Sequence, residues 1–193
     1  MDLILSIAEK QMRRKGERFR LLPAISLVVC LALLCGGDEP SQEYKVKAAF
    51  VYNFARFIEW PAAAFANTDA PFVIAVVGTD PFNGGLEQAV AGKLVGTRHV
   101  EIRHFDSVDK IGPCQILFVP TTDDDKEAKI IQKVKGKHVL TIGESENFDS
   151  SGGCLRFFTQ DNKIRFEINT GSADQEQLKI SSKLLKLARI FEK

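Results

Sequence analysis

The sequence predicts an α/β fold: a three-layer sandwich with a mostly parallel central sheet, a C-terminal antiparallel hairpin at one edge, and flanking N- and C-terminal helices. Residues 72–77, 116–119 and 139–142 are short, continuous apolar runs, which are typical of strands buried on both faces of a parallel sheet. Helical segments separate these runs, as in strand–helix–strand units. Residues 155–159 and 164–168 flank a polar turn and predict the hairpin.

Residues 43–61 predict the N-terminal helix, with Pro61 as its end. Phenylalanines at helical spacing line one face, and other apolar side chains lie beside them. Such a helix must be covered on more than one side, so we expect it in the core. The apolar positions are Phe50, Val51, Phe54, Ala55, Phe57 and Ile58.

Two elements are predicted between the first and second buried strands. Asp80 suits a helix N-cap and Pro81 a first helical residue, so a helix is expected over residues 82–90. Residues 100–105 alternate apolar and charged side chains, which indicates a strand nearer the sheet edge.

Two further helices follow. Residues 124–134 begin with acidic side chains, and either Thr122 or Asp123 is expected to cap them. Residues 178–191 have an amphipathic pattern and predict the C-terminal helix, with Ser172 as a candidate cap before it. The side chains expected to face inward are Leu184, Leu185, Leu187, Ala188 and Phe191.

The N-terminal region predicts a cleaved secretion signal at residues 1–37. Basic residues at 13–20 precede an apolar run at 21–34, and Gly36 and Gly37 are small residues that suit signal peptidase. That run is shorter than the roughly 20 residues that a membrane span needs. The alternatives left open are an uncleaved anchor, a translation start at Met12 and a lipid anchor on Cys35.

Cleavage after residue 37 leaves 156 residues, which suit a single domain at residues 38–193. Its 20 basic and 22 acidic residues give a net charge of −2. No basic stripe with interleaved aromatic side chains occurs in the sequence, so nucleic acid is not an expected partner.

Two cysteines, Cys114 and Cys154, remain after cleavage. Both open predicted strands, and a third predicted strand at residues 138–142 lies between them in sequence. If it also lies between them in the sheet, they are about 9–10 Å apart, too far for a disulfide. We favour free thiols, with a bridge as the alternative.

Polar residues after the predicted strands do not complete a catalytic motif. The turn at residues 78–81 lacks the glycines of a nucleotide-binding loop, so an ordinary capped helix is favoured over a small-anion site. Ser145 lacks the second glycine of a nucleophile elbow, because Asn147 takes its place. We therefore expect no catalytic residue and no cofactor.

No metal site is expected either. The acidic residues at 123–125 suit the start of a helix. The histidines show neither H-x-x-x-H nor H-x-H spacing, so they are weak candidates for metal ligands. They are His99, His104 and His138.

Several segments, in order along about Glu43 to Leu187, resemble the YfiR family, also called the DUF4154 domain. They are residues 44–50, Asn53, Phe54, Trp60, Pro61, 78–82, 114–119, 164–169 and 178–188. The resemblance implies a periplasmic negative regulator that holds off a membrane-bound diguanylate cyclase by protein–protein interaction. Cyclic-di-GMP signalling, and with it biofilm formation, would be lowered.

The resemblance also implies partners. An OmpA-like outer-membrane lipoprotein can sequester such a repressor, dimers are usual, and no catalysis is expected. Family members with more cysteines form two bridges. Because only Cys114 and Cys154 remain here, redox tuning stays open for this chain.

The C-terminal blocks are where the resemblance implies partner contacts. The candidate residues are Arg165, Phe166, Glu167, Ile168, Ser181, Ser182 and Leu185. Arg165 and Glu167 are favoured, because charges on a hairpin strand point to solvent or to a partner, whereas a packing role is favoured for Leu185. Lys47 and Trp60 form a second candidate, as a small-ligand or dimer surface, although a lone Trp at a helix end more often packs on the sheet.

Two other functions stay open. The first is a periplasmic small-molecule-binding module that acts on another membrane signalling protein, such as a histidine kinase; a ligand-dependent rise in melting temperature would favour it. The second is an enzyme that uses Asp80, which would require turnover that Asp80→Ala abolishes.

Overall fold

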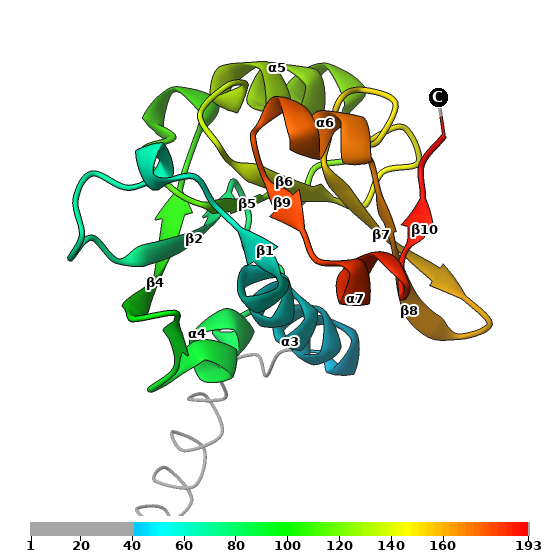
Figure 1. The fold of residues 1–193 in the computed structure, drawn as a ribbon. Coiled ribbons are helices and arrows are strands. Elements are labelled where there is room, and N and C mark those ends of the chain that lie inside the picture. Colours follow the sequence, from blue (N-terminus) through cyan, green and yellow to red (C-terminus); the bar gives the residue numbers. More distant parts are fainter. Residues whose placement is uncertain (1–40, 193) are drawn as a thin grey trace, which may run out of the picture. The chain divides into compact units, whose positions relative to one another are not determined.

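The computed structural model describes residues 41–192, and the predicted signal peptide at residues 1–37 lies outside them. An eight-stranded sheet forms the centre of the described part (Figure 1). Its strands, in spatial order, are β10 (Arg189–Ile190), β8 (Lys163–Ile168), β7 (Leu155–Gln160), β6 (Leu140–Gly143), β5 (Ile116–Phe118), β2 (Phe72–Val77), β4 (Arg98–Phe105) and β3 (Leu94–Val95). Among residues 41–192, a helix with the length and apolar character to cross a membrane does not occur.

Most neighbouring strands run parallel, as predicted. β4, β2, β5, β6 and β7 form a continuous parallel array, to which the β7–β8 hairpin and the β3–β4 pair add antiparallel contacts. The predicted strands at 100–105, 116–119 and 139–142 are confirmed with boundaries that differ by one or two residues. A parallel array needs crossover connections, and here these pass over both faces of the sheet.

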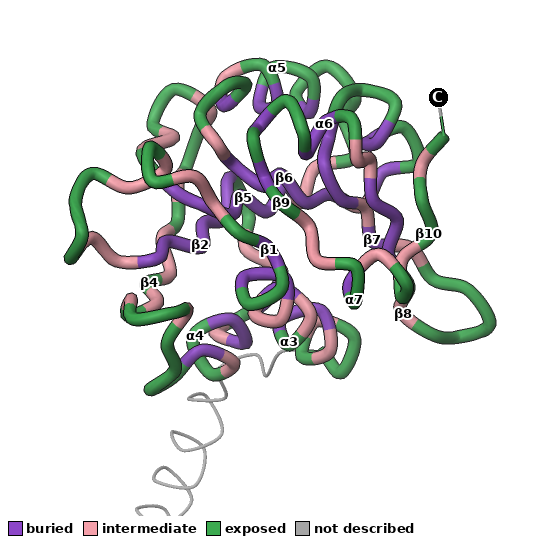
Figure 2. Tube along the Cα trace, viewed as in Figure 1, coloured by how far each residue is buried: buried purple, intermediate pink, exposed green. Residues whose placement is uncertain are grey.

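The two faces of the sheet bury separate apolar clusters, because side chains alternate between faces along each strand. Ile74 and Val76 point into the cluster beneath α3 (Gln42–Phe57) and α4 (Gly85–Val90). Val73 and Ala75 point into the cluster beneath α5 (Asp124–Val134) and beside η3 (Val108–Lys110). Buried residues therefore concentrate along the central strands (Figure 2), and the three-layer sandwich is confirmed.

Helix α3 is a core helix, but its predicted extension to Pro61 was wrong. Ser41 Oγ accepts a hydrogen bond from Tyr44 N at 3.4 Å and caps the N-terminus. The helix ends at Phe57, whose carbonyl accepts a 2.9 Å bond from Ser181 N. Residues Ile58–Glu59 are extended as β1, antiparallel to β9 (Lys179–Ile180), and η2 (Ala62–Ala64) follows. Long-range strand pairing thus replaces the last helical turn.

Helix α4 begins three residues later than predicted. Asp80 Oδ1 accepts a 2.8 Å bond from Phe82 N, so Asp80 caps a turn and not the helix. Asn83 and Gly84 then have φ of 47° and 79°, which is incompatible with a right-handed helix. The packing of Phe82 explains why the chain turns here before the helix begins, because its fully buried ring packs against Tyr44 and Phe118.

The single C-terminal helix predicted over residues 178–191 was wrong. The segment forms β9, the short helix α7 (Ser182–Leu185) and β10, after a separate helix α6 (Thr170–Gln175). Ser172 lies inside α6, and Asn169 caps that helix instead. Leu184 is buried as predicted, whereas Leu187 is 71% exposed.

Strand β6 lies between β5 and β7, and so separates the two cysteines that precede those strands. Cys114 and Cys154 are both buried and unpaired. Burial raises the pKa of the Cys114 thiol to about 12 and that of the Cys154 thiol to about 11. Both thiols are therefore protonated at neutral pH and unreactive.

Candidate protein-docking surface

An apolar pocket of about 150 Å³ lies between α3 and α7. Two of its apolar side chains are exposed: Phe57 by 37% and Leu187 by 71%. Large apolar side chains that remain in water on a monomer mark places where another surface can bind. The full lining is Phe50, Asn53, Phe54, Phe57, Phe166, Lys183, Leu184 and Leu187.

Packed aromatic rings form the floor of this pocket. The Phe166 ring centroid lies 5.0 Å from that of Phe54 and 5.7 Å from that of Phe50. On the sheet, Phe166 is paired with Phe157 across the β7–β8 hairpin. The hairpin register is set by a two-residue turn in which Asp161 and Asn162 both have positive φ, as a type I′ turn requires. The floor is therefore fixed, while the exposed side chains project from it.

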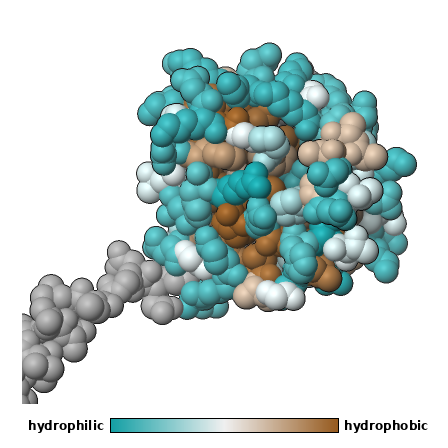
Figure 3. Space-filling view, turned by 90° about the vertical axis from the view of Figure 1, so that its left-hand side faces the viewer, coloured by the Kyte–Doolittle hydropathy of each residue, from teal (hydrophilic) through white to brown (hydrophobic). Residues whose placement is uncertain are grey.

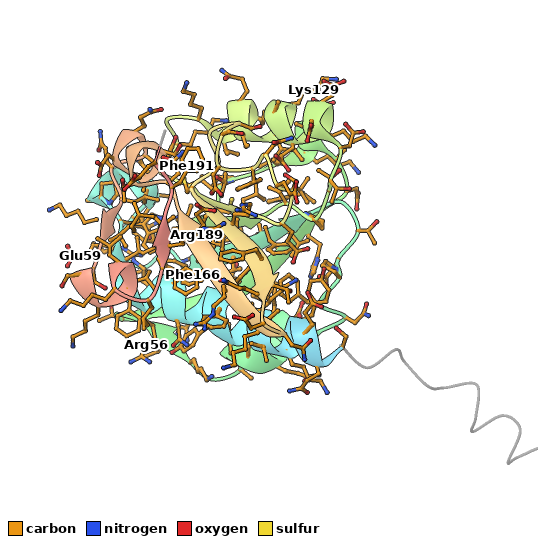
Figure 4. All side chains as sticks on the ribbon, turned by 90° about the vertical axis from the view of Figure 1, so that its right-hand side faces the viewer. Arg56, Glu59, Lys129, Phe166, Arg189 and Phe191 are labelled. Atoms are coloured by element: carbon orange, nitrogen blue, oxygen red, sulfur yellow. The ribbon has the colours of Figure 1, made fainter. Side chains whose placement is uncertain are left out.

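A partly buried ionic network surrounds Glu167, the residue after Phe166 on β8, and includes Arg189, which Figure 4 labels. Glu167 Oε2 accepts hydrogen bonds from Arg156 Nη2 at 2.5 Å and from Arg189 Nη2 at 2.7 Å. Arg156 Nε also donates to Asp149 Oδ2 at 2.8 Å. Arg189 lies over the Phe158 ring, 4.1 Å from its centroid. These four charged residues hold β7, β8, β10 and the loop before β7 together.

Burial raises the pKa values of the Asp149 and Glu167 carboxylates, whereas the neighbouring arginines lower them. Burial raises the pKa of Asp149 to about 6, and Arg156 opposes this only in part. Burial would also raise the pKa of Glu167, but hydrogen bonds from Arg189 and Arg156 outweigh it, so that pKa is lowered. Asp149 Oδ1 has no hydrogen-bond partner among the described residues.

The predicted partner residues occupy different environments around this pocket. Arg165 and Ser182 are exposed, whereas Phe166 and Ile168 are buried in the core. Ser181 Oγ caps α7 by accepting a 3.3 Å bond from Leu184 N, and Leu185 is half-buried. The expectation that Glu167 points to solvent was wrong, because it is 7% exposed within the ionic network.

The second predicted pair, Lys47 and Trp60, is not brought together. Lys47 is buried and forms ion pairs with Glu43 and Glu144, at the end where β6 terminates. Trp60 donates a 3.2 Å bond from Nε1 to the Gln115 carbonyl, just before β5 begins. The Lys47 contact lies at the C-terminal end of the parallel strands and the Trp60 contact at their N-terminal end. Trp60 also packs edge-on against Phe72.

Tyr44 shares the Lys47 site. Its hydroxyl donates a 3.0 Å bond to Glu144 Oε2, and the Lys47 ammonium lies 4.5 Å from its ring centroid. Burial, together with the charge of Glu144, raises the pKa of Tyr44 well above its ordinary value. The cluster joins α3 to the loop after β6 and has the character of a structural contact.

The other polar candidates do not assemble into reactive groups. Ser145 Oγ donates to Glu127 Oε2 at 2.6 Å. His104 lies 3.1 Å from Glu87 Oε1. Asp123, one of the two predicted caps, caps α5 by accepting a 3.1 Å bond from Lys126 N. Residues 41–192 hold no group of three or more His, Cys, Asp or Glu side chains arranged for a metal.

A family model described as YfiR/HmsC-like (DUF4154) matches residues 44–189, most of the chain. The chain belongs to this family. YfiR/HmsC-like proteins are periplasmic and regulatory, and they are associated with the control of membrane diguanylate cyclases in cyclic-di-GMP signalling.

The other comparisons add little to the family assignment. A comparison with curated proteins found no match. Among solved structures, the ABC domain in complex with L-Trp from Streptococcus pneumonia has a TM-score of 0.46 at 11% identity. The match covers 62% of this YfiR/HmsC-like chain and 55% of the chain in that structure.

The sequence of this YfiR/HmsC-like protein predicted partner contacts in the C-terminal blocks, but it did not indicate that Phe57 and Leu187 are exposed. Leu187 was expected to face inward, and Phe57 was treated as a core side chain. The ionic network was also missed, because Asp149, Arg156 and Arg189 come from three separate segments. A sequence signal existed for Arg156 and Glu167, since charged residues interrupt otherwise apolar runs there.

Proposed function

We propose that this protein is a periplasmic repressor that binds the periplasmic part of a membrane-bound diguanylate cyclase and lowers cyclic-di-GMP signalling. The family supports the regulatory role. The observation that carries the binding role is the apolar pocket between α3 and α7, with Phe57 and Leu187 in water above a packed aromatic floor.

The pocket suits an apolar side chain of a partner. Binding energy at interfaces concentrates in a few large apolar residues that fill well-packed depressions, with polar residues around them. Asn53 and Lys183 supply polar groups in the lining. A floor that is already ordered lowers the entropy cost of binding.

The same surface can serve both partners that the family resemblance implies. If an OmpA-like outer-membrane lipoprotein covered the pocket, the cyclase could not bind there, and repression would be relieved. We further propose that the chain is exported by cleavage after residue 37, which leaves one domain at residues 38–193. Export places that domain beside both membranes.

The test is the cellular cyclic-di-GMP level after deletion of the gene, with complementation by the full chain or by a chain that lacks residues 1–37. We expect the level to rise on deletion and to fall again only with the full chain. An unchanged level on deletion contradicts the repressor proposal under the growth conditions used.

The docking surface is tested by Phe57→Asp and Leu187→Asp in the complementing chain. A charged side chain at either position would have to be desolvated on binding, so we expect each variant to be exported and folded but not to repress. The matched control is Ala128→Asp, an exposed α5 position on the other face of the sheet. Repression that survives both pocket substitutions would exclude this surface.

A second candidate function, a small-molecule sensor for another membrane signalling protein, is favoured by a different feature. An open groove of about 770 Å³ between α3 and α4 includes Tyr52, Arg56 and Lys93 in its lining. Lys93 Nζ lies 4.7 Å from the Tyr52 ring centroid. Such a groove suits a small anion. A melting-temperature rise with pyrophosphate or citrate that Lys93→Ala removes would support it.

A further inference from the structure

A pocket of about 510 Å³ lies at the N-terminal ends of β5 and β6. Its lining comes from residues 63–66 in and after η2, residues 111–114 before β5, and residues 134–139 between α5 and β6. The volume falls within the roughly 300–1,000 Å³ that small-molecule sites in proteins occupy. Among residues 41–192, it shares no lining residue with the pocket between α3 and α7 or with the groove between α3 and α4. It is therefore a separate site.

The walls of this pocket are held by buried polar side chains. Gln115, which is 4% exposed, donates a 2.6 Å bond from Nε2 to the Ala64 carbonyl and so fixes η2 beside β5. On the other wall, the Glu176 carboxylate accepts bonds from Gly136 N at 2.7 Å and from His138 N at 2.8 Å. Because both walls are anchored, the pocket is already formed before a ligand binds, which lowers the entropy cost of binding.

The lining favours an aliphatic chain over an aromatic ring. Alanine, valine, isoleucine and proline supply most of its side chains. Phe65 is the only Phe, Tyr or Trp in the lining among the described residues, and the Arg98 guanidinium already lies over its ring, 3.9 Å from the centroid. Burial raises the pKa of the Cys114 thiol to about 12, so this thiol is neutral too.

One exposed cation, Lys137, stands beside this apolar wall. Within residues 41–192, the lining contains no Asp or Glu, and Lys137 forms no ion pair. His138, the other basic residue of the lining, has its Nδ1 3.0 Å from the Glu176 carbonyl. A single positive charge beside an apolar wall attracts a ligand with one negative charge and an apolar remainder. A sugar or a nucleotide would leave many polar groups unpaired against such a lining.

We propose that this pocket binds a medium-chain aliphatic carboxylate, with its chain against the apolar wall and its carboxylate beside the Lys137 ammonium. Figure 3 faces the side of the molecule at the left of Figure 1, which includes η2, and shows apolar surface bordered by hydrophilic residues there. The same combination of apolar surface and polar rim suits an amphipathic ligand. The site lies apart from the pocket between α3 and α7, so the inference does not depend on the repressor proposal.

The chain-length dependence of binding tests the apolar part of the proposal. The probes are butyrate, hexanoate and octanoate, titrated calorimetrically into protein purified after expression of the full chain. Affinity should rise about threefold for each methylene added, because each one removes further apolar surface from water. Octanamide has a similar chain without the charge and should bind about fivefold more weakly than octanoate.

Substitutions of Lys137 test the charge. Lys137→Ala should bind octanoate and octanamide about equally. Lys137→Glu should prefer octylammonium to octanoate, which reverses the wild-type preference. The matched control is Lys129→Glu, at an exposed position of α5 outside the lining, and it should bind all the probes as wild type does. Because Lys137 is exposed, we expect all three variants to keep the wild-type melting temperature within a few degrees.

A substitution that fills the pocket tests its position. Ala63 is an exposed residue of η2 in the lining, and Ala63→Trp should lower octanoate affinity by about tenfold or more. In wild type, nuclear Overhauser effects should connect the octanoate methylenes to the Val139 methyl groups. The proposal would be overturned by absent octanoate binding at millimolar concentration, by an affinity independent of chain length, or by an unchanged preference in Lys137→Glu. Each of these results can be obtained whatever the outcome of the repression assay.

Discussion

Arg189 Nη2 donates a 2.7 Å hydrogen bond to Glu167 Oε2 and so connects the last strand, β10, to β8. The main chain of the two strands is also joined, because Phe191 N donates to the Ile168 carbonyl at 2.9 Å. Since β10 has only two residues, a side-chain bond of this kind is a substantial part of what holds it. The C-terminal segment in turn carries Leu187, which lines the pocket between α3 and α7.

Arg189→Ala should therefore loosen the C-terminus. The variant loses a charge-assisted hydrogen bond and the contact with the Phe158 ring, while Glu167 keeps Arg156. We expect the free energy of unfolding in urea to fall by about 1–2 kcal/mol, and the Phe191 amide to exchange faster. Arg165→Ala, at an exposed position on β8, should change stability by less than about 0.5 kcal/mol. Equal effects of the two variants would contradict the role of the bond.

Asp149 should make stability fall as pH rises from 5 to 7. Burial raises its pKa from 3.8 to about 6, so the folded protein binds this proton more tightly than the unfolded chain. The resulting stabilisation is fully present below pH 3.8 and is lost as pH rises through about 6. From this group alone we expect an unfolding free energy about 1 kcal/mol higher at pH 5 than at pH 7.

Asp149→Asn isolates that contribution, because the amide cannot titrate. Glu167 has a lowered pKa, so its contribution is lost only as pH falls below about its ordinary value of 4.5, outside the pH 5–7 window. The difference in unfolding free energy between wild type and Asp149→Asn, measured by urea denaturation at both pH values, should change by about 1 kcal/mol. A difference independent of pH would show that Asp149 is ionised throughout.

The central sheet could be predicted because local pattern and tertiary environment agree there. Residues 72–77 are apolar at every position, and all six are buried in the parallel array. Helix α5 was predicted to the residue, since the Asp123 cap and the acidic first turn are local signals. The C-terminal residues 178–191 are amphipathic with helical spacing, yet pairing of β9 with β1 and β10 with β8 overrides that pattern. Such long-range pairing leaves no local signal.

The pocket between α3 and α7 could be predicted from the sequence only in part. The second sequence block includes Phe166 and Leu184, which form part of the pocket, but Phe57 and Asn53 come from a helix more than a hundred residues earlier. Glu167 was expected to point to solvent, because alternation along a strand predicts which face of the sheet a side chain lies on but not which other residues cover that face. Arg189 covers Glu167 there, and the sequence had predicted Arg189 to lie in a helix.

Gly143→Ala should destabilise the loop between β6 and β7. A Cβ at Gly143 would lie 2.2 Å from Phe148 Cδ2, and Phe148 is fully buried. We expect a loss of about 2–3 kcal/mol in unfolding free energy, as for an overpacked core. Gly112→Ala is the matched control, because its Cβ would lie 3.6 Å from the Phe105 ring. Combining Gly143→Ala with Phe148→Leu should cost less than the sum of the single changes.

Glu176 should be among the most sensitive single positions in the protein. Its carboxylate accepts hydrogen bonds from Gly136 N at 2.7 Å, His138 N at 2.8 Å and Val139 N at 3.3 Å. It thereby accepts from three main-chain donors between α5 and β6. His138 in this segment has a positive φ of 60°, an unfavourable backbone conformation that these hydrogen bonds stabilise.

Glu176→Ala would leave those donors without their acceptor in a part-buried site, so we expect a loss of about 1–3 kcal/mol by urea denaturation. Glu176→Gln keeps one carbonyl oxygen as an acceptor and should lose about half as much. The matched control is Glu146→Ala, an exposed carboxylate in the loop after β6, with an expected change below about 0.5 kcal/mol. If Glu176→Gln proved as costly as Glu176→Ala, the charge of Glu176 and not its acceptor geometry would be what stabilises this connection.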